Sequence, residues 1–265
     1  MSSDLNITPL ILTYNEEANI DRTLDSLRWA KSVVVLDSGS TDKTEQIARG
    51  YSNVVWCARA FDSHKAQWEY GVHQTGITTE YVLALDADQS VPYEFVEELR
   101  EQFMPGQWVG GMTPFKYSYY GHPLSGSVYP KQIRVFKRNA LQVTQPGHTQ
   151  VFSVEGAVYN FRACLIHDDR KPLDRWVASQ VAYQALNEKE MLEGGSLKCR
   201  LRRMGLMPPI MATLAYIRAG GPFRGAAAAR YAYERAVAES LLAIRLLNVR
   251  LNSNGSSAKE ESARK

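Results

Sequence analysis

Two carboxylates spaced two residues apart are the strongest chemical signal in the sequence. Asp86 and Asp88 directly follow the apolar run 81–85, whose unbroken hydrophobicity is typical of a buried parallel strand. Residues two apart in an extended chain point the same way, so both carboxylates face one spot. Such oxygen ligands suit Mg²⁺ or Mn²⁺, which can neutralise a diphosphate. The alternative is that Asp88 caps the helix expected near Pro92 and that Asp86 is a solvated loop acid.

Asp37 ends another apolar run, 32–36, and is followed by a turn at Gly39. A carboxylate offers acceptors alone, which suits the donor groups of a nucleobase or a sugar. Gly39 permits a tight turn. The segment also fits a plain strand–turn–helix connection, and we interpret Asp42 as a helix cap.

A third polar group lies at the end of the first apolar run, 9–13, and comprises Thr13, Tyr14, Asn15, Glu16 and Glu17. The Tyr14 ring could stack on a base or simply pack. Acidic residues in the first turn of a helix are favoured by the helix dipole alone, so Glu16 and Glu17 carry less information than Asp37 or Asp88.

The first hundred residues alternate between such apolar runs and segments with helical spacing. This rhythm predicts an α/β fold with a mostly parallel sheet and helices on both faces. The carboxyl ends of parallel strands meet at one edge, where α/β sheets bind ligands, so the three polar groups converge on one crevice. Further strands are expected at 132–136, 150–154 and 157–165, with helices at 172–193 and from about Gly225 to Leu251.

These motifs resemble those of the family 2 glycosyltransferases with the GT-A fold. The resemblance rests on the segments 12–20, 35–44 and 85–88, whose order and spacing match over residues 7–103. Residues 129–138, 166–170 and 176–183 resemble one branch, the small bacterial enzymes that add sugars to the lipopolysaccharide core or related envelope glycans.

The resemblance implies a role for each of these residues. Thr13 and Tyr14 would line the base pocket, Glu16 or Glu17 would lie near the base or ribose, and Asp37 would contact the base. Asp86 would approach the ribose. Asp88 would hold Mn²⁺ or Mg²⁺ on the donor diphosphate, with Asp86 and His148 as further candidate ligands. The reaction would be inverting, by direct displacement.

An inverting transfer needs a base for the acceptor hydroxyl. Related enzymes often carry His-Glu where this chain has His148 and Thr149, and threonine cannot act as a carboxylate base. The remaining candidates are Asp168 and Asp169, of which one could lie in the crevice with a raised pKa. Alternatively, these two acids belong to a charged loop whose members pair with one another. Glu155 is a more distant candidate.

Charge divides the chain. Residues 1–197 carry 18 Lys and Arg against 24 Asp and Glu, and residues 198–250 carry 10 against 2, so an acidic body precedes a basic segment. We expect a nucleotide-sugar-binding half at 1–105, an acceptor-binding half at 106–197, a basic amphipathic helical segment at 198–251 and a disordered tail at 252–265. The basic segment flanks the apolar stretch 204–217, which suits peripheral contact with an anionic membrane surface; packing of this stretch on the catalytic domain is the alternative.

Other features narrow the function class. The basic segment is interleaved with methionine and aliphatic residues rather than stacking aromatics, which argues against nucleic acid. Three cysteines without CxxC spacing argue against a disulfide framework and a zinc site. The start lacks the basic region of a signal peptide. We therefore expect a cytoplasmic protein. The stretch 204–217 is too short to span a bilayer. The partners expected are a nucleotide-sugar donor and a glycan or lipid-linked acceptor. The alternative is a nucleotidyltransferase, or a sugar-nucleotide-binding protein without transferase activity. A nucleotidyltransferase would require a glycine-rich basic loop in place of Glu16 and Glu17.

Overall fold

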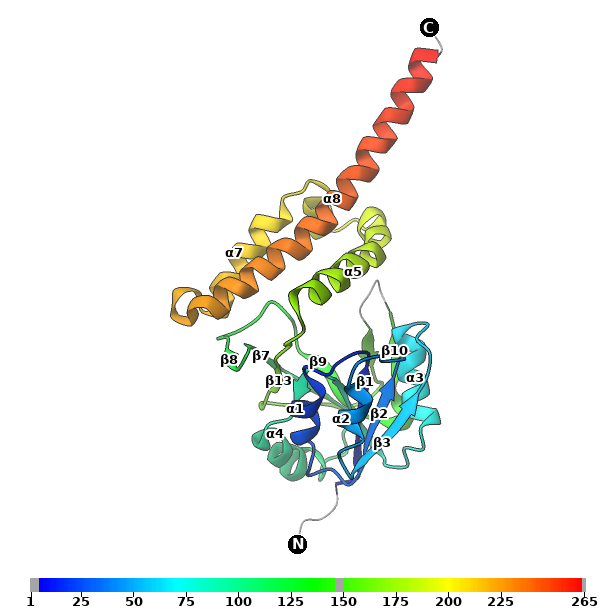
Figure 1. The fold of residues 1–265 in the computed structure, drawn as a ribbon, viewed down its shortest axis with the longest axis vertical. Coiled ribbons are helices and arrows are strands. Elements are labelled where there is room, and N and C mark those ends of the chain that lie inside the picture. Colours follow the sequence, from blue (N-terminus) through cyan, green and yellow to red (C-terminus); the bar gives the residue numbers. More distant parts are fainter. Residues whose placement is uncertain (1–4, 146–149, 264–265) are drawn as a thin grey trace. The chain divides into compact units, whose positions relative to one another are not determined.

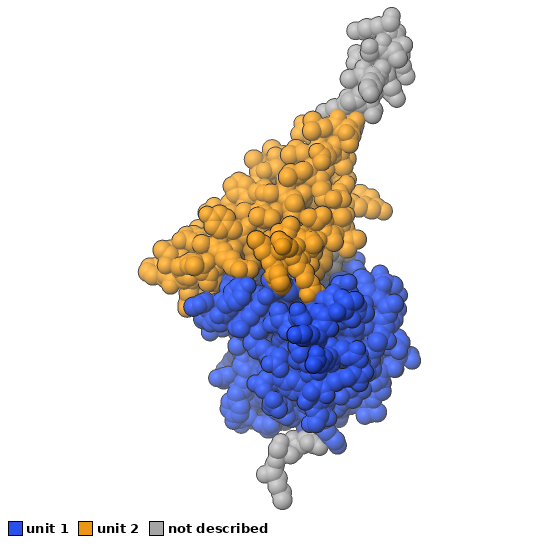
Figure 2. All heavy atoms as spheres, in the orientation of Figure 1, with its two compact units in different colours: residues 1–123, 129–145, 149–171 blue, residues 124–128, 146–148, 172–265 orange. Residues whose placement is uncertain are grey.

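The computed structural model describes residues 5–145 and 150–263, with side chains as far as Asn252. The chain forms two compact units (Figures 1 and 2). Unit 1 comprises residues 1–123, 129–145 and 149–171, and unit 2 comprises residues 124–128, 146–148 and 172–265. The main division along the chain falls between Lys171 and Pro172, and residues 106–123, 129–145 and 150–171 lie in the same unit as the first hundred residues. The functional halves expected at 1–105 and 106–197 stay a prediction.

A seven-stranded sheet is the centre of unit 1, in the order β12-β6-β9-β4-β1-β2-β3. The strands are β1 (Ile7–Thr13), β2 (Val33–Asp37), β3 (Val54–Ala58), β4 (Tyr81–Asp86), β6 (Gly110–Thr113), β9 (Gln132–Lys137) and β12 (Val158–Asn160). The pairs β4–β1, β1–β2, β2–β3 and β12–β6 are parallel, while β9 runs antiparallel to both of its neighbours. The sheet is thus mainly parallel, as predicted.

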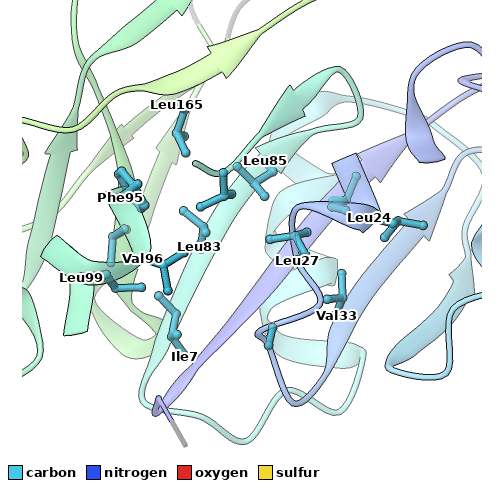
Figure 3. Packing of buried hydrophobic residues seen from close by; sticks show 14 of the residues in the cluster. Ile7, Leu24, Leu27, Val33, Leu83, Leu85, Phe95, Val96, Leu99 and Leu165 are labelled. Carbon is cyan, nitrogen blue, oxygen red and sulfur yellow. The ribbon is translucent and has the colours of Figure 1, made fainter. Parts of the chain in front are cut away.

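Alternate residues of the central strands enter two separate cores, one on each face of the sheet. In β4, Leu83 and Leu85 join one core, while Val82 and Ala84 join the other. The first core contains side chains of α1 (Ile20–Asp25), α4 (Tyr93–Glu98) and the π-helical turn η1 (Leu99–Phe103) (Figure 3). The second contains Trp68 and Val72 of α3 (His64–Gln74). Helices cover both faces, which explains why the strands show no polar alternation.

A second, four-stranded sheet has the order β5-β13-β7-β8. It consists of β5 (Gln89–Ser90), β7 (Phe115–Tyr119), β8 (His122–Pro123) and β13 (Leu165–His167). β13 pairs antiparallel with β5 through His167 and Gln89, directly after the Asp86–Asp88 segment. The remaining elements of unit 1 are α2 (Thr44–Ala48), the 3-10 turn η2 (Arg138–Ala140), and the paired strands β10 (Gln142–Thr144) and β11 (Val151–Ser153).

The sequence predicted one strand over 157–165, and this prediction was wrong. The segment divides into β12 and β13, which belong to different sheets. Between them, the amides of Arg162 and Ala163 donate to the Glu98 carboxylate, which satisfies the backbone where it leaves one sheet for the other.

Unit 2 is mainly helical, with α5 (Leu173–Glu193), α6 (Leu197–Arg203), α7 (Met207–Ala219), the short 3-10 turn η3 (Gly221–Arg224) and α8 (Gly225–Ala263). α8 packs along α7 and α5. It continues past Leu251, where the sequence predicted its end, to Ala263. No helix among the described residues is both long and apolar enough to cross a membrane.

Candidate functional site

The carboxyl ends of β2, β1 and β4 lie side by side and carry the predicted site residues. In the strand register, Thr13 of β1 lies opposite Asp37 of β2, and Leu12 lies opposite Asp86 of β4. The three polar groups predicted to converge are therefore brought to one sheet edge.

Hydrogen bonds join the loops that follow β1 and β2. The Asn15 amide donates to Ser40 Oγ at 2.6 Å, and Asn15 Oδ1 accepts from the Thr41 amide at 2.7 Å. Asn15 has φ = 55°, a left-handed conformation that asparagine tolerates better than most residues. Asp42 Oδ1 accepts from the amide of Thr44, the first residue of α2, but the N-cap position itself is occupied by Lys43, so the interpretation of Asp42 as the cap was wrong by one residue.

Asp37, Thr13 and Tyr14 differ in how much of each side chain is accessible. The Asp37 carboxylate is buried, and its Oδ2 accepts from the amides of Gly39 and Ser40, both at 2.8 Å. Thr13 is also buried, and its hydroxyl oxygen has no hydrogen-bond partner. Tyr14 is 54% exposed, so its ring offers a surface for stacking.

Asp86 is held by a buried arginine that the sequence analysis did not assign. Its Oδ2 accepts from Arg134 Nη2 at 3.1 Å and from Gln89 Nε2 at 2.6 Å. Burial acts to raise the pKa of Asp86, but the charges of Arg134 and His167 outweigh it and hold this pKa below its ordinary value. Nε and Nη1 of Arg134 are buried without partners.

Asp88 adjoins the segment that follows β13. Its carbonyl oxygen accepts from the Asp168 amide at 3.1 Å. Its Oδ2 lies 3.6 Å from His167 Nε2 and 3.6 Å from Lys171 Nζ, while its Oδ1 is buried without a partner. Asp88 lies in the turn that follows β4 and not in extended chain, and a histidine and a lysine lie beside it.

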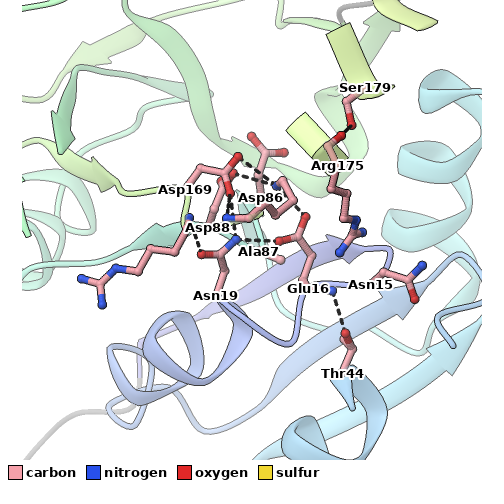
Figure 4. Close-up of polar contacts among 12 residues, drawn as sticks. Asn15, Glu16, Asn19, Thr44, Asp86, Ala87, Asp88, Asp169, Arg175 and Ser179 are labelled. Atoms are coloured by element: carbon pink, nitrogen blue, oxygen red, sulfur yellow. Dashed lines mark hydrogen bonds and ion pairs between the residues drawn. The ribbon is translucent and has the colours of Figure 1, made fainter. Parts of the chain in front are cut away.

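Lys171 is the centre of the acidic cluster formed by Glu16, Asp88 and Asp169. Its Nζ lies 2.9 Å from Glu16 Oε1 and 3.2 Å from Asp169 Oδ2. Asn19 Nδ2 joins the same carboxylates, donating to Glu16 Oε2 at 2.8 Å and to Asp169 Oδ1 at 3.0 Å (Figure 4). Residues from the loop after β1, the end of β4 and the segment after β13 therefore form one network.

The network shifts the pKa values of its members in different directions. Burial raises the pKa of Glu16 and outweighs the attraction of Lys171. Burial also acts to raise the pKa of Asp169, but the Lys171 charge and the hydrogen bonds to this carboxylate hold it below its ordinary value. For Lys171, burial is outweighed by Asp88, Glu16 and Asp169, which raise its pKa well above the ordinary range. The raised pKa considered for a base at 168–169 is thus wrong for Asp169.

Asp168 is buried beside Asp169 but has other partners. Its Oδ2 accepts from the Gly121 amide at 3.0 Å and from Arg170 Nη2 at 2.7 Å. Its Oδ1 is buried without a partner. Arg22 of α1 donates to the Asp168 carbonyl oxygen. The two acids are paired within their loop, as the alternative interpretation expected, yet one oxygen of Asp168 remains uncommitted.

Several other predicted residues lie away from this network or beyond what can be described. Glu155, which lies shortly after β11, accepts from Nε2 of Gln142 in β10 at 3.1 Å. His148 and Thr149 lie outside the described residues, so the proposed ligation by His148 stays a prediction. Sequence reasoning missed the pairing of Arg134 with Asp86 and the contacts of Lys171 and Asn19 with Glu16. The position of Lys171 in the charged segment 168–171 was the available signal.

Within residues 5–145 and 150–263, no group of three or more His, Cys, Asp or Glu side chains is arranged to hold a metal ion. Asp88 Oδ1 nevertheless offers one buried, unpartnered carboxylate oxygen. Mg²⁺ and Mn²⁺ are commonly held by one or two carboxylates together with substrate phosphates. The donor set therefore fits a cation shared with a bound diphosphate rather than one enclosed by protein ligands.

Comparison of folds defines the class of protein. The structure resembles that of residues 1–349 of S. aureus TarS in complex with UDP, with a TM-score of 0.50, 13% sequence identity, and coverage of 94% of this chain and 92% of that chain. Together with the mainly parallel sheet and its acidic carboxyl edge, this likeness defines the GT-A glycosyltransferase fold.

The sequence identifies the family. The profile of Glycosyl transferase family 2 matches residues 10–164, more than half of the chain. The chain therefore belongs to glycosyl transferase family 2 and is a glycosyltransferase.

Two curated relatives agree with this assignment. The lipopolysaccharide core biosynthesis glycosyltransferase LpsC of Rhizobium meliloti (strain 1021) is 24% identical over 230 residues, which cover 83% of this chain and 84% of LpsC. An uncharacterized glycosyltransferase of Rickettsia bellii (strain RML369-C) is 32% identical over 98 residues, which cover 37% of this chain and 32% of that protein.

Proposed function

We propose that this glycosyltransferase moves a sugar from a nucleotide-diphosphate donor to an envelope glycan or glycolipid acceptor. The observation that carries the proposal is the convergence of Asp37, Asp86 and Asp88 at the carboxyl edge of three adjacent parallel strands. The similarity to LpsC supports an acceptor of the lipopolysaccharide-core type, and the fold likeness to TarS with UDP supports a nucleotide donor.

The donor's nucleoside would bind over the ends of β1 and β2. The exposed ring of Tyr14 would stack on the base, with Thr13 beside it. Asp37 would accept a hydrogen bond from the base, because a carboxylate has room for about four such bonds and the Gly39 and Ser40 groups leave one site.

The donor's diphosphate would lie beside Asp88. We propose that Asp88 is the main carboxylate ligand of Mn²⁺ or Mg²⁺, since its Oδ1 is unpartnered while Asp86 is engaged by Arg134 and Gln89. Asp86 would then approach the ribose. A bound cation would supply electrostatic stabilisation of the leaving nucleoside diphosphate.

Transfer with inversion requires a base for the acceptor hydroxyl. We propose that an acid of the pair Asp168 and Asp169 removes this proton as the hydroxyl oxygen attacks the anomeric carbon. Asp168 fits better, because its Oδ1 has no partner, whereas Asp169 is bound by Lys171 and Asn19. Arg170 would hold the other oxygen of Asp168 and so orient it.

A lipid-linked acceptor would require the enzyme to reach the cytoplasmic face of the inner membrane. Apolar residues of α7 and η3 are exposed, among them Ile210, Ile217 and Phe223. Arg218 directly follows Ile217, and Arg224 directly follows Phe223. Cationic residues that flank exposed apolar side chains favour an anionic lipid surface. We propose that this part of unit 2 docks on such a membrane.

The test of the function is a thermal-shift panel of nucleoside diphosphates with and without Mn²⁺, followed by transfer assays with the nucleotide sugars that bind. A ligand that binds the native state alone raises the melting temperature. We expect one nucleoside diphosphate to do so in a Mn²⁺-dependent manner, and its sugar to appear on a lipopolysaccharide-core acceptor. Binding without transfer to any envelope glycan would contradict the proposed acceptor class.

A further inference from the structure

A single buried ammonium group is shared by the three carboxylates of the acidic cluster. The Lys171 side chain is 14% exposed, and its Nζ lies 2.9, 3.2 and 3.6 Å from oxygens of Glu16, Asp169 and Asp88. Buried charges are costly unless they are paired, so each of these groups depends on the others. Lys171 is therefore the positive charge that makes the cluster tolerable inside the fold.

The sharing is uneven. Glu16 and Asp169 lie within hydrogen-bond reach of the ammonium and accept further hydrogen bonds from Asn19. Asp88 lies farther away, at 3.6 Å, and its second oxygen is buried without a partner. One ammonium cannot neutralise three carboxylates, and Asp88 is the least satisfied of them. The cluster consequently keeps an attraction for a second cation at Asp88.

The neighbouring acid, Asp86, is fully paired with a basic residue, unlike Asp88. Asp86 has its own cation, because Arg134 Nη2 lies 3.1 Å from its Oδ2, and Gln89 donates to the same oxygen. The two carboxylates of the Asp-Ala-Asp segment are thus paired with different basic residues, Asp86 with Arg134 and Asp88 with Lys171 and His167.

We propose that Lys171 is a binding residue with two roles: its ammonium is the resident counter-charge of Asp88 before a divalent cation arrives, and it contacts the donor's diphosphate afterwards. The cation and the ammonium compete for Asp88, and the diphosphate provides the negative charge that lets both remain. This inference rests on the proposed function. It adds a phosphate-binding residue that the sequence motifs did not indicate.

The first measurement is the affinity for Mn²⁺ alone. It is determined from the electron paramagnetic resonance signal of the Mn²⁺ that remains free. Lys171→Met keeps most of the unbranched side chain and removes its charge. Because the competing cation is gone, we expect Mn²⁺ to bind roughly tenfold tighter than to the unmodified protein. Lys65→Met is the matched control, since Lys65 also pairs with a carboxylate, Glu69, but is about half exposed on α3; its Mn²⁺ affinity should not change.

The second measurement is the affinity for UDP at saturating Mn²⁺. Here the variant should bind less tightly than the unmodified protein. We expect Lys171→Met to bind UDP roughly tenfold more weakly, because one charge-assisted contact to phosphate is lost. Lys171→Arg keeps the charge and should restore both affinities to within a few-fold of the original. Near-ultraviolet circular dichroism of each variant verifies that the fold persists. If the methionine variant does not fold, Lys171→Gln, which is neutral but polar, takes its place with the same expected changes in both affinities.

The outcomes separate the inference from the proposed function. If the unmodified protein binds Mn²⁺ and UDP while Lys171→Met binds both with unchanged affinity, the role of Lys171 is overturned and the proposed function stands. Weaker Mn²⁺ binding by Lys171→Met would also overturn the proposed competition between the Lys171 ammonium and the divalent cation for Asp88. If neither protein binds Mn²⁺ or any nucleoside diphosphate, both proposals fail.

Discussion

The backbone amide of Asp168 donates a hydrogen bond of 3.1 Å to the carbonyl oxygen of Asp88. This contact, next to the pairing of β13 with β5, fixes the segment 168–171 beside the end of β4. The candidate base and the candidate metal ligand are consequently positioned by the same backbone ladder. A displacement of β13 would disturb both, whereas a change at either side chain alone should leave the other in place.

The first prediction concerns the carboxylate of Asp88. Asp88→Asn removes the charge but keeps the shape, so we expect the fold to persist and Mn²⁺-dependent donor turnover to fall by about 100-fold or more, because a metal-bound leaving group is worth several kcal/mol. Turnover is measured as release of the nucleoside diphosphate. Asp25→Asn is the matched control, since Asp25, the last residue of α1, is exposed and pairs with Arg28. Full turnover by Asp88→Asn would overturn the metal assignment.

The second prediction distinguishes the two acids after β13. Asp168→Asn should lower kcat by about 10²- to 10⁴-fold, the usual contribution of a general base, while the affinity for the donor stays within a few-fold. Asp169→Asn should affect kcat less, because its carboxylate is bound by Lys171 and Asn19. Rate measurements across pH add a second readout, since loss of the base removes the acidic limb of the profile. Unchanged kcat in both variants would exclude this pair as the base.

The positions of the donor-side residues could be predicted because they follow directly from local patterns. Asp37 and Asp86 end strands whose apolar runs are unmistakable, and parallel pairing of β1, β2 and β4 is enough to bring them together. Nothing local indicates that β13 returns to the end of β4, so the partnership of Lys171 with Asp88 could not be predicted. It depends on pairings between segments about 80 residues apart.

The change of sheet between β12 and β13 escaped prediction for a similar reason. Apolar residues recur throughout 157–165, because Phe161, between the two strands, packs in the same core as Leu165 of β13. The break is made by the Glu98 carboxylate, which accepts from two consecutive amides and lies far away in sequence. Hydrophobicity alone reports burial, not which sheet a segment joins.

The third prediction concerns stability at low pH. The pKa of Asp169 is held below its ordinary value of 3.8 by Lys171, so this carboxylate contributes stability above that pH and loses it as the pH falls through the lower folded value. The free energy of unfolding, measured in urea from pH 7 to pH 2, should therefore fall more steeply for the unmodified protein than for Asp169→Asn. Lys171→Met removes the cause of the shift and should flatten the curve likewise. Parallel curves for all three proteins would contradict the ion pair.

The fourth prediction concerns membrane contact by unit 2. Phe223 is 95% exposed in η3, between Arg218 and Arg224, and a ring so placed gains most by entering the interface of a bilayer. Vesicles containing anionic phospholipid should bind the protein, with an affinity that falls at high salt, and neutral vesicles should bind it far less, since each basic residue near an anionic surface is worth about 1 kcal/mol. Phe223→Ser should weaken binding to the anionic vesicles by about tenfold, and Arg218→Gln with Arg224→Gln should remove much of the salt dependence.

Tyr93→Ser is the control, because Tyr93 is a similarly exposed aromatic residue, 72% accessible, on α4 of unit 1. Equal sedimentation of Phe223→Ser and Tyr93→Ser with the vesicles would show that η3 is not the point of contact.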